Sequence, residues 1–250
     1  CRLVDGCGVS GLHSRAAGQD PQDLRGLLIR RSLRALQRGT DVPTDSPLSP
    51  PSNPFATRFT RPSAGEYLFP AGAGAGALLA RLRDQNWWGQ ITGPHGSGKS
   101  TIVHTLLPEL QAAGRRVECY PLHQPASRPC GTSPAAVRWG DYIANWNGST
   151  QVVIDGCEQL GRWRRVWLQW HCRRRGAGLL VTAHRDLGLP PLWRTEPSVE
   201  LAQRLVARLL GEGNADWSGA EQIERLFAEH RGNLREMLFA LYDLYERPPP

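Results

Sequence analysis

The residues that decide the fold run from 88 to 101 and read WGQITGPHGSGKST. The first six form a short apolar run that ends in glycine, as a buried strand does before a turn. Residues 93–100 fit the pattern G-x-x-x-x-G-K-[ST], and residues 97–113 carry apolar side chains at the i, i+3, i+4, i+7 spacing of one helix face. A strand, this loop and an amphipathic helix, in that order, predict a phosphate-binding loop.

The residue types in the loop explain this prediction. Its three glycines let the backbone turn tightly and bring N–H groups against phosphate oxygens, and the start of the following helix adds partial positive charge. Lys99, the only lysine in the chain, would reach the β- and γ-phosphates of a nucleotide, and Ser100 would ligate Mg²⁺. The predicted nucleotide-binding residues of the loop are Gly93, Pro94, His95, Gly96, Ser97, Gly98, Lys99, Ser100 and Thr101.

A site of this kind also needs an acidic residue at the end of a neighbouring strand. Residues 151–155 read QVVID, which is typical of a buried strand and places Asp155 at its end. Asp155 is therefore predicted to hold Mg²⁺ through water, together with Ser100. The same carboxylate could cap the following helix, and the two roles are compatible.

Strand and helix patterns alternate along the rest of the chain. Further strands are predicted over 116–122, 179–184 and, as a short candidate, Ser198–Leu201, and helices over 160–175, 202–210, 218–230 and 234–246. Strands separated by helices predict a parallel sheet covered on both faces. We therefore expect an α/β P-loop NTPase fold, with a parallel sheet flanked by helices and a small C-terminal helical lid.

Composition predicts how the chain is divided. Residues 41–54 contain five prolines, which indicates a linker. Residues 21–38 could form a basic helix that lies on a membrane surface or on nucleic acid, or only a marginal helix in a flexible tail. We expect a disordered leader and Pro/Ser-rich linker over 1–53, a P-loop nucleotide-binding domain over 54–201 and the helical lid over 202–250.

Composition also narrows the function classes. Of the 250 residues, 40% are apolar and 21% are charged, which excludes a wholly disordered or collagen-like chain. No run approaches the ~20 apolar residues of a membrane span, and no signal peptide is apparent, so we expect a cytoplasmic protein with no membrane partner. The net charge of +7 permits a nucleic-acid or phosphate partner without demanding one.

Two details concern single residue types. The six cysteines show no CxxC pair, which favours free thiols over a disulfide framework or a zinc site. The chain begins with Cys1 and its one methionine is Met237, so we expect a fragment, a processed product or an upstream-extended reading frame.

With these motifs in place, residues 54–246 resemble the additional-strand class of P-loop ATPases, and within it the AAA+ family. The resemblance implies ATP and Mg²⁺ as ligands, a catalytic role for Lys99, and Asp155 as the Walker B aspartate. Family members place a catalytic glutamate directly after that aspartate, where this chain has Gly156. The nearest carboxylate, Glu158, is the candidate catalytic base. Alternatively, it lies only in the first turn of the next helix, where negative charge is favourable.

Two further residues match positions with which the family senses the γ-phosphate. Thr182, with His184 just after it, stands at the sensor-1 position, and a buried threonine bonded to backbone is the alternative. The sequence GNLRE at 232–236 resembles the start of the sensor-2 helix. Arg235 would then reach from the lid to the γ-phosphate as a catalytic residue, and a surface arginine is the alternative.

Some assignments have two candidates. The arginine finger, which acts between subunits in this family, would be Arg185 or Arg194, and the sequence does not choose between them. Phe55 or Phe59 could stack on adenine, although packing under the sheet is the favoured role.

A helix face rich in tryptophan has two interpretations. Trp163, Val166, Trp167 and Trp170 fall on one face of the helix predicted over 160–175, amid six arginines. This helix must cover the sheet, so we favour core packing with a solvated basic edge. The alternative is a clamp for single-stranded nucleic acid.

Three functions remain open. The leading one is an ATP-binding module that hydrolyses ATP with Mg²⁺ and couples it to a protein partner, to self-assembly or to nucleic acid. The first alternative is a small-molecule P-loop kinase in which Asp155 activates an acceptor hydroxyl. The second is a nucleotide-gated signalling adaptor with little turnover, which Gly156 after Asp155 favours.

Overall fold

The computed structural model describes residues 53–122, 139–211 and 219–247. The chain divides into two units, Cys1–Val42 and Pro43–Pro250, and all described residues belong to the second. Apart from Asn53, the leader predicted over 1–53 lies outside the described residues, as does the basic helix predicted over 21–38.

The described residues form a five-stranded parallel sheet in the order β2-β3-β4-β1-β5. Its strands are β1 (Trp88–Thr92), β2 (Arg116–Pro121), β3 (Thr150–Asp155), β4 (Gly178–Ala183) and β5 (Pro191–Arg194). This confirms the predicted α/β class and parallel sheet. Because β4 stands between the strand that leads into the loop and the strand that ends in Asp155, the order also confirms the resemblance to the additional-strand class.

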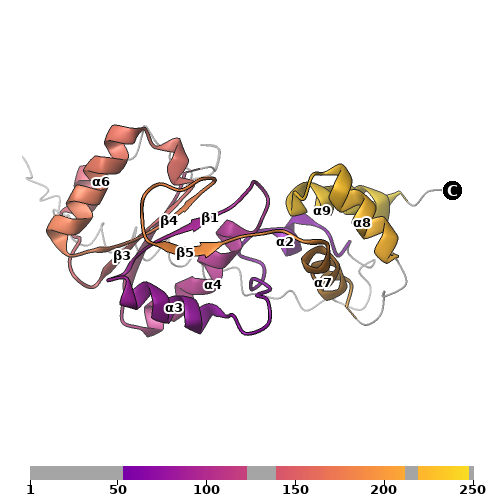
Figure 1. The fold of residues 1–250 in the computed structure, drawn as a ribbon, viewed down its shortest axis with the longest axis horizontal. Helices are drawn as coiled ribbons and strands as arrows, with labels where there is room; N and C mark the ends of the chain where they lie inside the picture. Colours follow the sequence, from indigo (N-terminus) through magenta and orange to yellow (C-terminus); the bar gives the residue numbers. More distant parts are fainter. Residues whose placement is uncertain (1–52, 123–138, 212–218, 248–250) are drawn as a thin grey trace, which may run out of the picture. The chain divides into compact units, whose positions relative to one another are not determined.

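Helices connect and cover the strands. They are α2 (Thr57–Thr60), α3 (Ala75–Asp84), α4 (Lys99–Ala112), α5 (Trp139–Ile143), a 3-10 turn at Cys157–Gln159, α6 (Arg162–Arg175), α7 (Val199–Leu210), α8 (Ala220–Glu229) and α9 (Leu234–Glu246). Figure 1 shows α6 on one face of the sheet and α3 and α4 on the other.

Alternating side chains of the central strands fill two separate cores. Val152 and Ile154 of β3 belong to one cluster, which includes Leu168 and Cys172 of α6. Val153, between them in sequence, belongs to the other cluster, with residues of α3 and α4. Since both faces of β3 and β4 are covered, every position of these strands is buried, polar residues included, and burial does not alternate along them.

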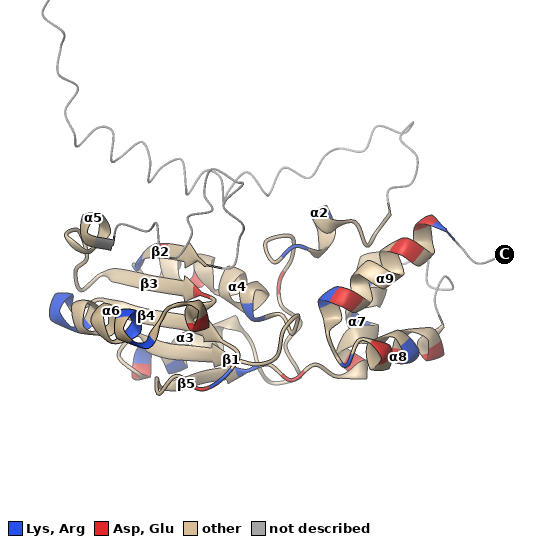
Figure 2. Cartoon of the chain, turned by 90° about the horizontal axis from the view of Figure 1, so that it is seen from above, with Lys and Arg blue, Asp and Glu red and all other residues tan. Residues whose placement is uncertain are grey.

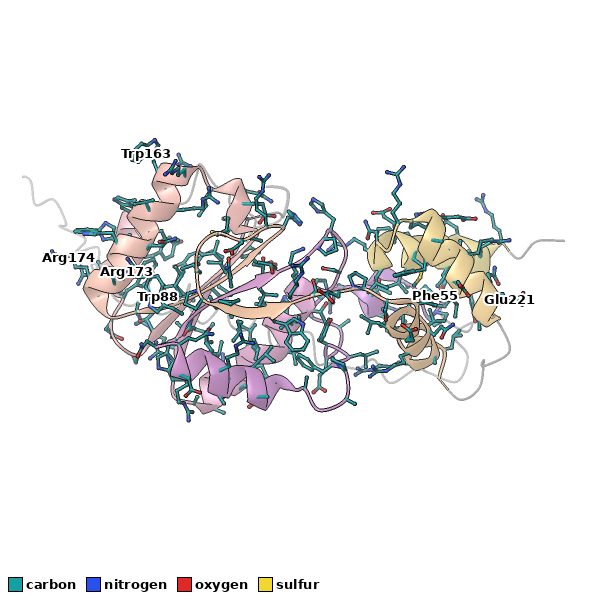
Figure 3. The ribbon with its side chains drawn as sticks, viewed as in Figure 1. Phe55, Trp88, Trp163, Arg173, Arg174 and Glu221 are labelled. Carbon is teal, nitrogen blue, oxygen red and sulfur yellow. The ribbon has the colours of Figure 1, made fainter. Side chains whose placement is uncertain are left out.

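The last three described helices, α7 to α9, share a third core. Met237 and Leu241 of α9 and Ala202 of α7 are fully buried there. Phe55 belongs to this core as well and meets Tyr245 edge to face, with ring centres 6.2 Å apart (Figure 3). The expectation that Phe55 packs under the sheet is therefore wrong: the chain segment before α2 joins the C-terminal helices.

The strand predicted at Ser198–Leu201 is also wrong. Ser198 is the N-cap of α7, and its Oγ accepts a hydrogen bond of 3.2 Å from Leu201 N, which fixes a helix start. The fifth strand is instead β5, which was not predicted; Pro190 directly precedes it and Pro191 is its first residue. Proline is tolerated here because β5 is an edge strand.

The favoured interpretation of the tryptophan face is wrong too. Trp163 is 84% exposed and Trp170 is 52% exposed, so neither packs on the sheet. The opposite face of α6 covers the sheet through Leu168 and Cys172. Two medium-sized apolar side chains therefore suffice for this contact, and the wider aromatic stripe faces solvent.

Among the helices of the described residues, none has the length and apolar character needed to cross a membrane.

Candidate functional site

The predicted site residues meet at one edge of the sheet. Because all strands are parallel, the carboxyl ends of β1, β3 and β4 and the loops after them lie at the same edge, where ligands bind in open α/β sheets. A cavity of about 850 Å³ opens there, within the usual size of a small-molecule site. Its lining includes His95, Gly96, Ser97, Gly98, Lys99, Ser100, Thr101, Asp155, Gly156, Glu158, Thr182, His184 and Arg235.

The loop between β1 and α4 depends on its glycines. Gly93, Gly96 and Gly98 all have positive φ, at 151°, 68° and 90°, a region that glycine enters at little cost. A Cβ at Gly93 would collide with Thr195, and a Cβ at Gly96 would collide with Asn233. Close approach from two other segments therefore reinforces the conformational need for glycine.

Thr195 is a structural partner of the loop that the sequence did not reveal. It is buried, its Oγ1 donates to Thr92 O at 3.2 Å, and it shares a 2.5 Å hydrogen bond with Ser97 Oγ. Ser97 Oγ is also bonded to Pro94 O. No motif marks Thr195, because its role comes from β5 pairing beside β1.

Lys99 is buried within the loop. Its Nζ donates to Gly93 O at 2.8 Å and Pro94 O at 2.6 Å. Burial lowers the pKa of the ammonium, and the carboxylates of Glu158 and Asp155 act in the opposite direction. The chain's one ammonium is thus placed where phosphate oxygens can replace the backbone oxygens as its partners.

Thr182 joins β4 to the end of β3. Its Oγ1 donates to Asp155 Oδ1 at 2.6 Å and accepts from Gly156 N at 2.8 Å. Thr182 is fully buried, so both ends of its hydroxyl are used. These bonds fix the orientation of the Asp155 carboxylate at the cavity.

Glu158 pairs with a histidine from the next strand. Its Oε1 lies 2.7 Å from His184 Nε2, and its Oε2 is buried with no hydrogen-bond partner among the described residues. His184 Nδ1 lies 3.3 Å from Lys99 Nζ, and the His184 ring lies 3.5 Å, centre to centre, from that of His95. No sequence pattern marks the Glu158–His184 pair, because Glu158 follows β3 and His184 follows β4.

The surroundings favour a neutral His184. Burial, followed by the nearby Lys99 ammonium, lowers its pKa, while Glu158 acts in the opposite direction. A neutral ring with its proton on Nε2 donates to Glu158 and accepts from Lys99 at the same time. No second positive charge then lies beside Lys99.

Arg235 lies in the first turn of α9, next to the loop. Asn233 caps this helix by accepting from the backbone N–H of Arg235 and Glu236, at 3.1 and 3.3 Å. The cap side chain packs against Gly96, which brings the exposed Arg235 to the cavity. The GNLRE sequence therefore gives both the helix start and the close approach to the loop.

The donors for a magnesium ion are oxygens, as that ion requires. Ser100 supplies a hydroxyl and Asp155 a carboxylate, and both line the cavity. Hard oxygen donors of one or two side chains, with substrate phosphates and water, are the usual ligands of Mg²⁺. These residues fit the predicted ion.

The remaining candidates differ in placement. Phe59 lines the cavity, and Phe55 does not. Neither Arg185 nor Arg194 lines it, and the exposed Arg194 pairs with Glu196 at 3.2 Å. No sequence pattern identified Tyr67, which lines the cavity and packs against Gly98.

Comparisons with known proteins find partial structural similarity only. No protein-family model matches the chain, and a search of curated proteins finds no significant match. Among solved structures, the chain is similar to a Walker-type ATPase of Pyrococcus abyssi (11% identity, TM-score 0.47, covering 70% of this chain and 67% of that one). It is also similar to RuvB of Thermotoga maritima (16% identity, TM-score 0.44, covering 68% of this chain and 60% of that one). A third similar structure is AMPPCP-bound DnaA of Aquifex aeolicus (12% identity, TM-score 0.45, covering 72% of this chain and 64% of that one). The chain thus spans about three fifths to two thirds of these proteins.

Proposed function

We propose that this protein binds ATP at the loop between β1 and α4 and hydrolyses it. One observation carries the proposal: Lys99, Asp155 and Glu158 line one cavity, and Glu158 is paired with His184 there. A phosphate-binding loop by itself indicates only an anion site. A loop lysine, an oriented aspartate and a second, separately oriented carboxylate are the groups that hydrolysis of a nucleotide needs.

Binding uses the loop and α4. Backbone N–H groups at the start of α4 and the Lys99 ammonium bind the phosphates, and the positive helix end supports them. Lys99 Nζ exchanges the carbonyls of Gly93 and Pro94 for phosphate oxygens. In this proposal Ser100 and Asp155 hold Mg²⁺, which when bound neutralises charge on the phosphates.

Glu158 is the proposed base. Its Oε1 accepts from His184 Nε2, so Oε2 is the oxygen that takes a proton from the attacking water. In this proposal His184 acts as a positioning residue, since its Nε2 is bonded to the carboxylate. A glutamate directly after Asp155 would stand at Gly156, whose φ of 88° disfavours any residue with a side chain, and this supports Glu158 as the base.

Arg235 is the proposed γ-phosphate sensor. It enters the cavity from α9, so its contact would link the nucleotide state to the helices α7 to α9. We assign residues 54–201 to a nucleotide-binding domain and 202–250 to the lid, with Asn53 and Phe55 attached to the lid core. A protein partner or a second copy of the chain would respond to this link.

A nucleotide-gated adaptor is the second candidate. The specific observation in its favour is that the carboxylate lies three residues after Asp155, in a 3-10 turn, and not directly after it. If a carboxylate at this position does not reach the attacking water, the protein binds nucleotide but turnover is slow.

Steady-state kinetics separate these functions. We would measure binding of a fluorescent ATP analogue and release of phosphate, with DNA, RNA and small hydroxyl acceptors added in turn. Free phosphate supports the ATPase. Tight binding without turnover under every condition supports the adaptor, and phosphate on an acceptor supports a kinase. No nucleotide binding at all contradicts the assignment of the site.

A further inference from the structure

The outward face of α6 carries three tryptophans. Trp163, Trp167 and Trp170 are 84%, 41% and 52% exposed, although a tryptophan in a monomer is usually largely buried. At 100° per residue they fall within about 60° of the helix circumference, opposite Leu168 and Cys172. They therefore form one aromatic stripe, and contiguous exposed apolar surface of this kind marks an interaction site.

Positive charge surrounds this stripe. Residues 162–175 contain no acidic residue, and Figure 2 shows basic positions at both ends of α6. The arginines of the helix are Arg162, Arg164, Arg165, Arg173, Arg174 and Arg175. A partner that covers the stripe must accept this charge, so it is an anion with flat or apolar groups.

One arginine lies within the stripe itself. The Arg174 guanidinium lies over the Trp170 ring, 5.4 Å from its centre, whereas Arg173 turns to the sheet and lies over Trp88, at 5.1 Å. Figure 3 shows Trp163 and Arg174 pointing away from the sheet. Aromatic rings and a guanidinium plane thus share one outward surface.

We infer that the outward face of α6 binds single-stranded nucleic acid. Exposed bases stack on the tryptophan rings and on guanidinium planes, and the flanking arginines bind the phosphates. A duplex does not fit, because its base faces are hidden. Stacking and phosphate contacts do not involve the 2′-hydroxyl, so DNA and RNA strands should bind alike.

The position of Arg174 distinguishes this ligand from an anionic membrane. In a helix that inserts its apolar face into a bilayer, charged side chains flank the stripe and reach toward water. Here the Arg174 guanidinium lies over the Trp170 ring, on the stripe's own side of the helix and at its C-terminal end, so insertion of this face would bring that charge to the bilayer. A single-stranded nucleic acid can stack a base on the tryptophan rings and bind the guanidinium through a phosphate.

Fluorescence anisotropy with labelled oligo(dT) and oligo(rU) of about 20 nucleotides tests this inference. We expect both to bind at low salt, equally well with and without ATP, and more tightly than a duplex of the same length. The Trp163→Ala/Trp170→Ala variant should bind at least about thirtyfold more weakly, at roughly 1 kcal/mol or more per stacked base. Trp163→Phe/Trp170→Phe should retain most of the affinity, because phenyl rings also stack.

One control variant and one further test variant show whether binding depends on the outward face of α6. Phe239→Ala removes an exposed aromatic residue of α9 and should leave oligonucleotide affinity unchanged. Arg174→Gln/Arg175→Gln should reduce the slope of log affinity against log salt by about 0.7 per lost phosphate contact. Thermal melting checks that each variant is folded.

The following results would overturn the inference: no oligonucleotide binding at low salt, equal affinity in the parent and the Trp→Ala variant, or a duplex bound as tightly as a single strand. Binding to phosphatidylserine vesicles without binding to oligonucleotides would assign the face to a membrane instead.

Discussion

Two threonines outside the sequence motif orient the groups of the site. Thr195 bonds to Ser97 and packs closely against Gly93, and Thr182 bonds to Asp155. Both are buried, so each hydroxyl must be satisfied within the protein, and the geometry follows from that requirement. Loop and aspartate are thereby oriented before any ligand arrives.

Lys99→Ala should abolish ATP binding, with a loss of affinity of at least about a hundredfold for the charge-assisted bonds removed. Lys99→Arg should fail as well, because the buried space between Gly93 O and Pro94 O fits a compact ammonium. Isothermal titration calorimetry measures both. Arg225→Ala, far from the cavity lining, is the control. Undiminished ATP affinity in Lys99→Ala would remove the basis of the nucleotide site.

Glu158→Gln should keep ATP affinity and lower turnover by the ~10²–10⁴-fold typical of a lost acid–base group. Asp155→Asn should weaken both, because it removes the proposed magnesium ligand. Exposed Glu196→Gln is the matched control. Phosphate release at saturating ATP gives the result, and parental turnover in Glu158→Gln would mean that the base lies elsewhere.

The role of His184 can be separated in a double-mutant cycle. If His184 acts only through Glu158, His184→Ala lowers turnover in the parent but adds nothing to the loss in Glu158→Gln. Additive losses would show instead that His184 acts independently of Glu158.

Helix α6 has two apolar faces, and only one of them packs against the sheet. Leu168 and Cys172 are aliphatic or small and fit between the side chains of β3 and β4, so the sheet takes that face. The tryptophans are larger and are interleaved with arginines, whose burial without partners is costly.

Leu168→Ala should therefore destabilise the protein by about 2–5 kcal/mol through a buried cavity, whereas Trp170→Ala should change stability by only about 0.5 kcal/mol. Urea denaturation measures both. A larger loss in Trp170→Ala than in Leu168→Ala would mean that the aromatic face packs on the sheet.

The start of α9 brings three residues together: Asn233, Gly96 and Arg235. Arg235→Ala should weaken ATP more than ADP, by about tenfold or more for one charge-assisted contact to the γ-phosphate. Competition against a fluorescent nucleotide measures the two affinities. Equal losses for ATP and ADP would give Arg235 a structural role.

For the whole molecule, acid should lower stability because the folded protein lowers the pKa of three histidines. Burial lowers the pKa of His104, burial with Lys99 lowers that of His184, and burial with the nearby Arg175 and Arg174 lowers that of His171, all below the ordinary 6.5. The unfolded chain then binds more protons than the native protein below that pH, so the free energy of unfolding falls as the pH decreases from about 7 to 5.

Urea denaturation at a series of pH values measures this decline. His104→Gln should make it less steep, since it removes one group that must protonate on unfolding. A decline of the same steepness in the variant would assign the effect to other groups.

The parallel α/β fold and the loop could be predicted from the amino-acid sequence, because both depend on local patterns. Apolar runs such as QVVID fix buried strands, and the glycines of GPHGSGKS fix a turn that few other residues can adopt. Helix α9 was predicted with its bounds, since Asn233 caps it and its apolar spacing is regular.

The side-chain pairings between strands, and the choice of which helix face is buried, depend on the tertiary structure. Thr195 reaches Ser97, and His184 reaches Glu158, because strands distant in sequence lie side by side. Likewise, the packing of Phe55 with α7 to α9 and the exposure of Trp163 depend on which neighbours are present. Periodicity shows that a helix has an apolar face, but the shape and chemistry of the opposing surface determine which face is buried.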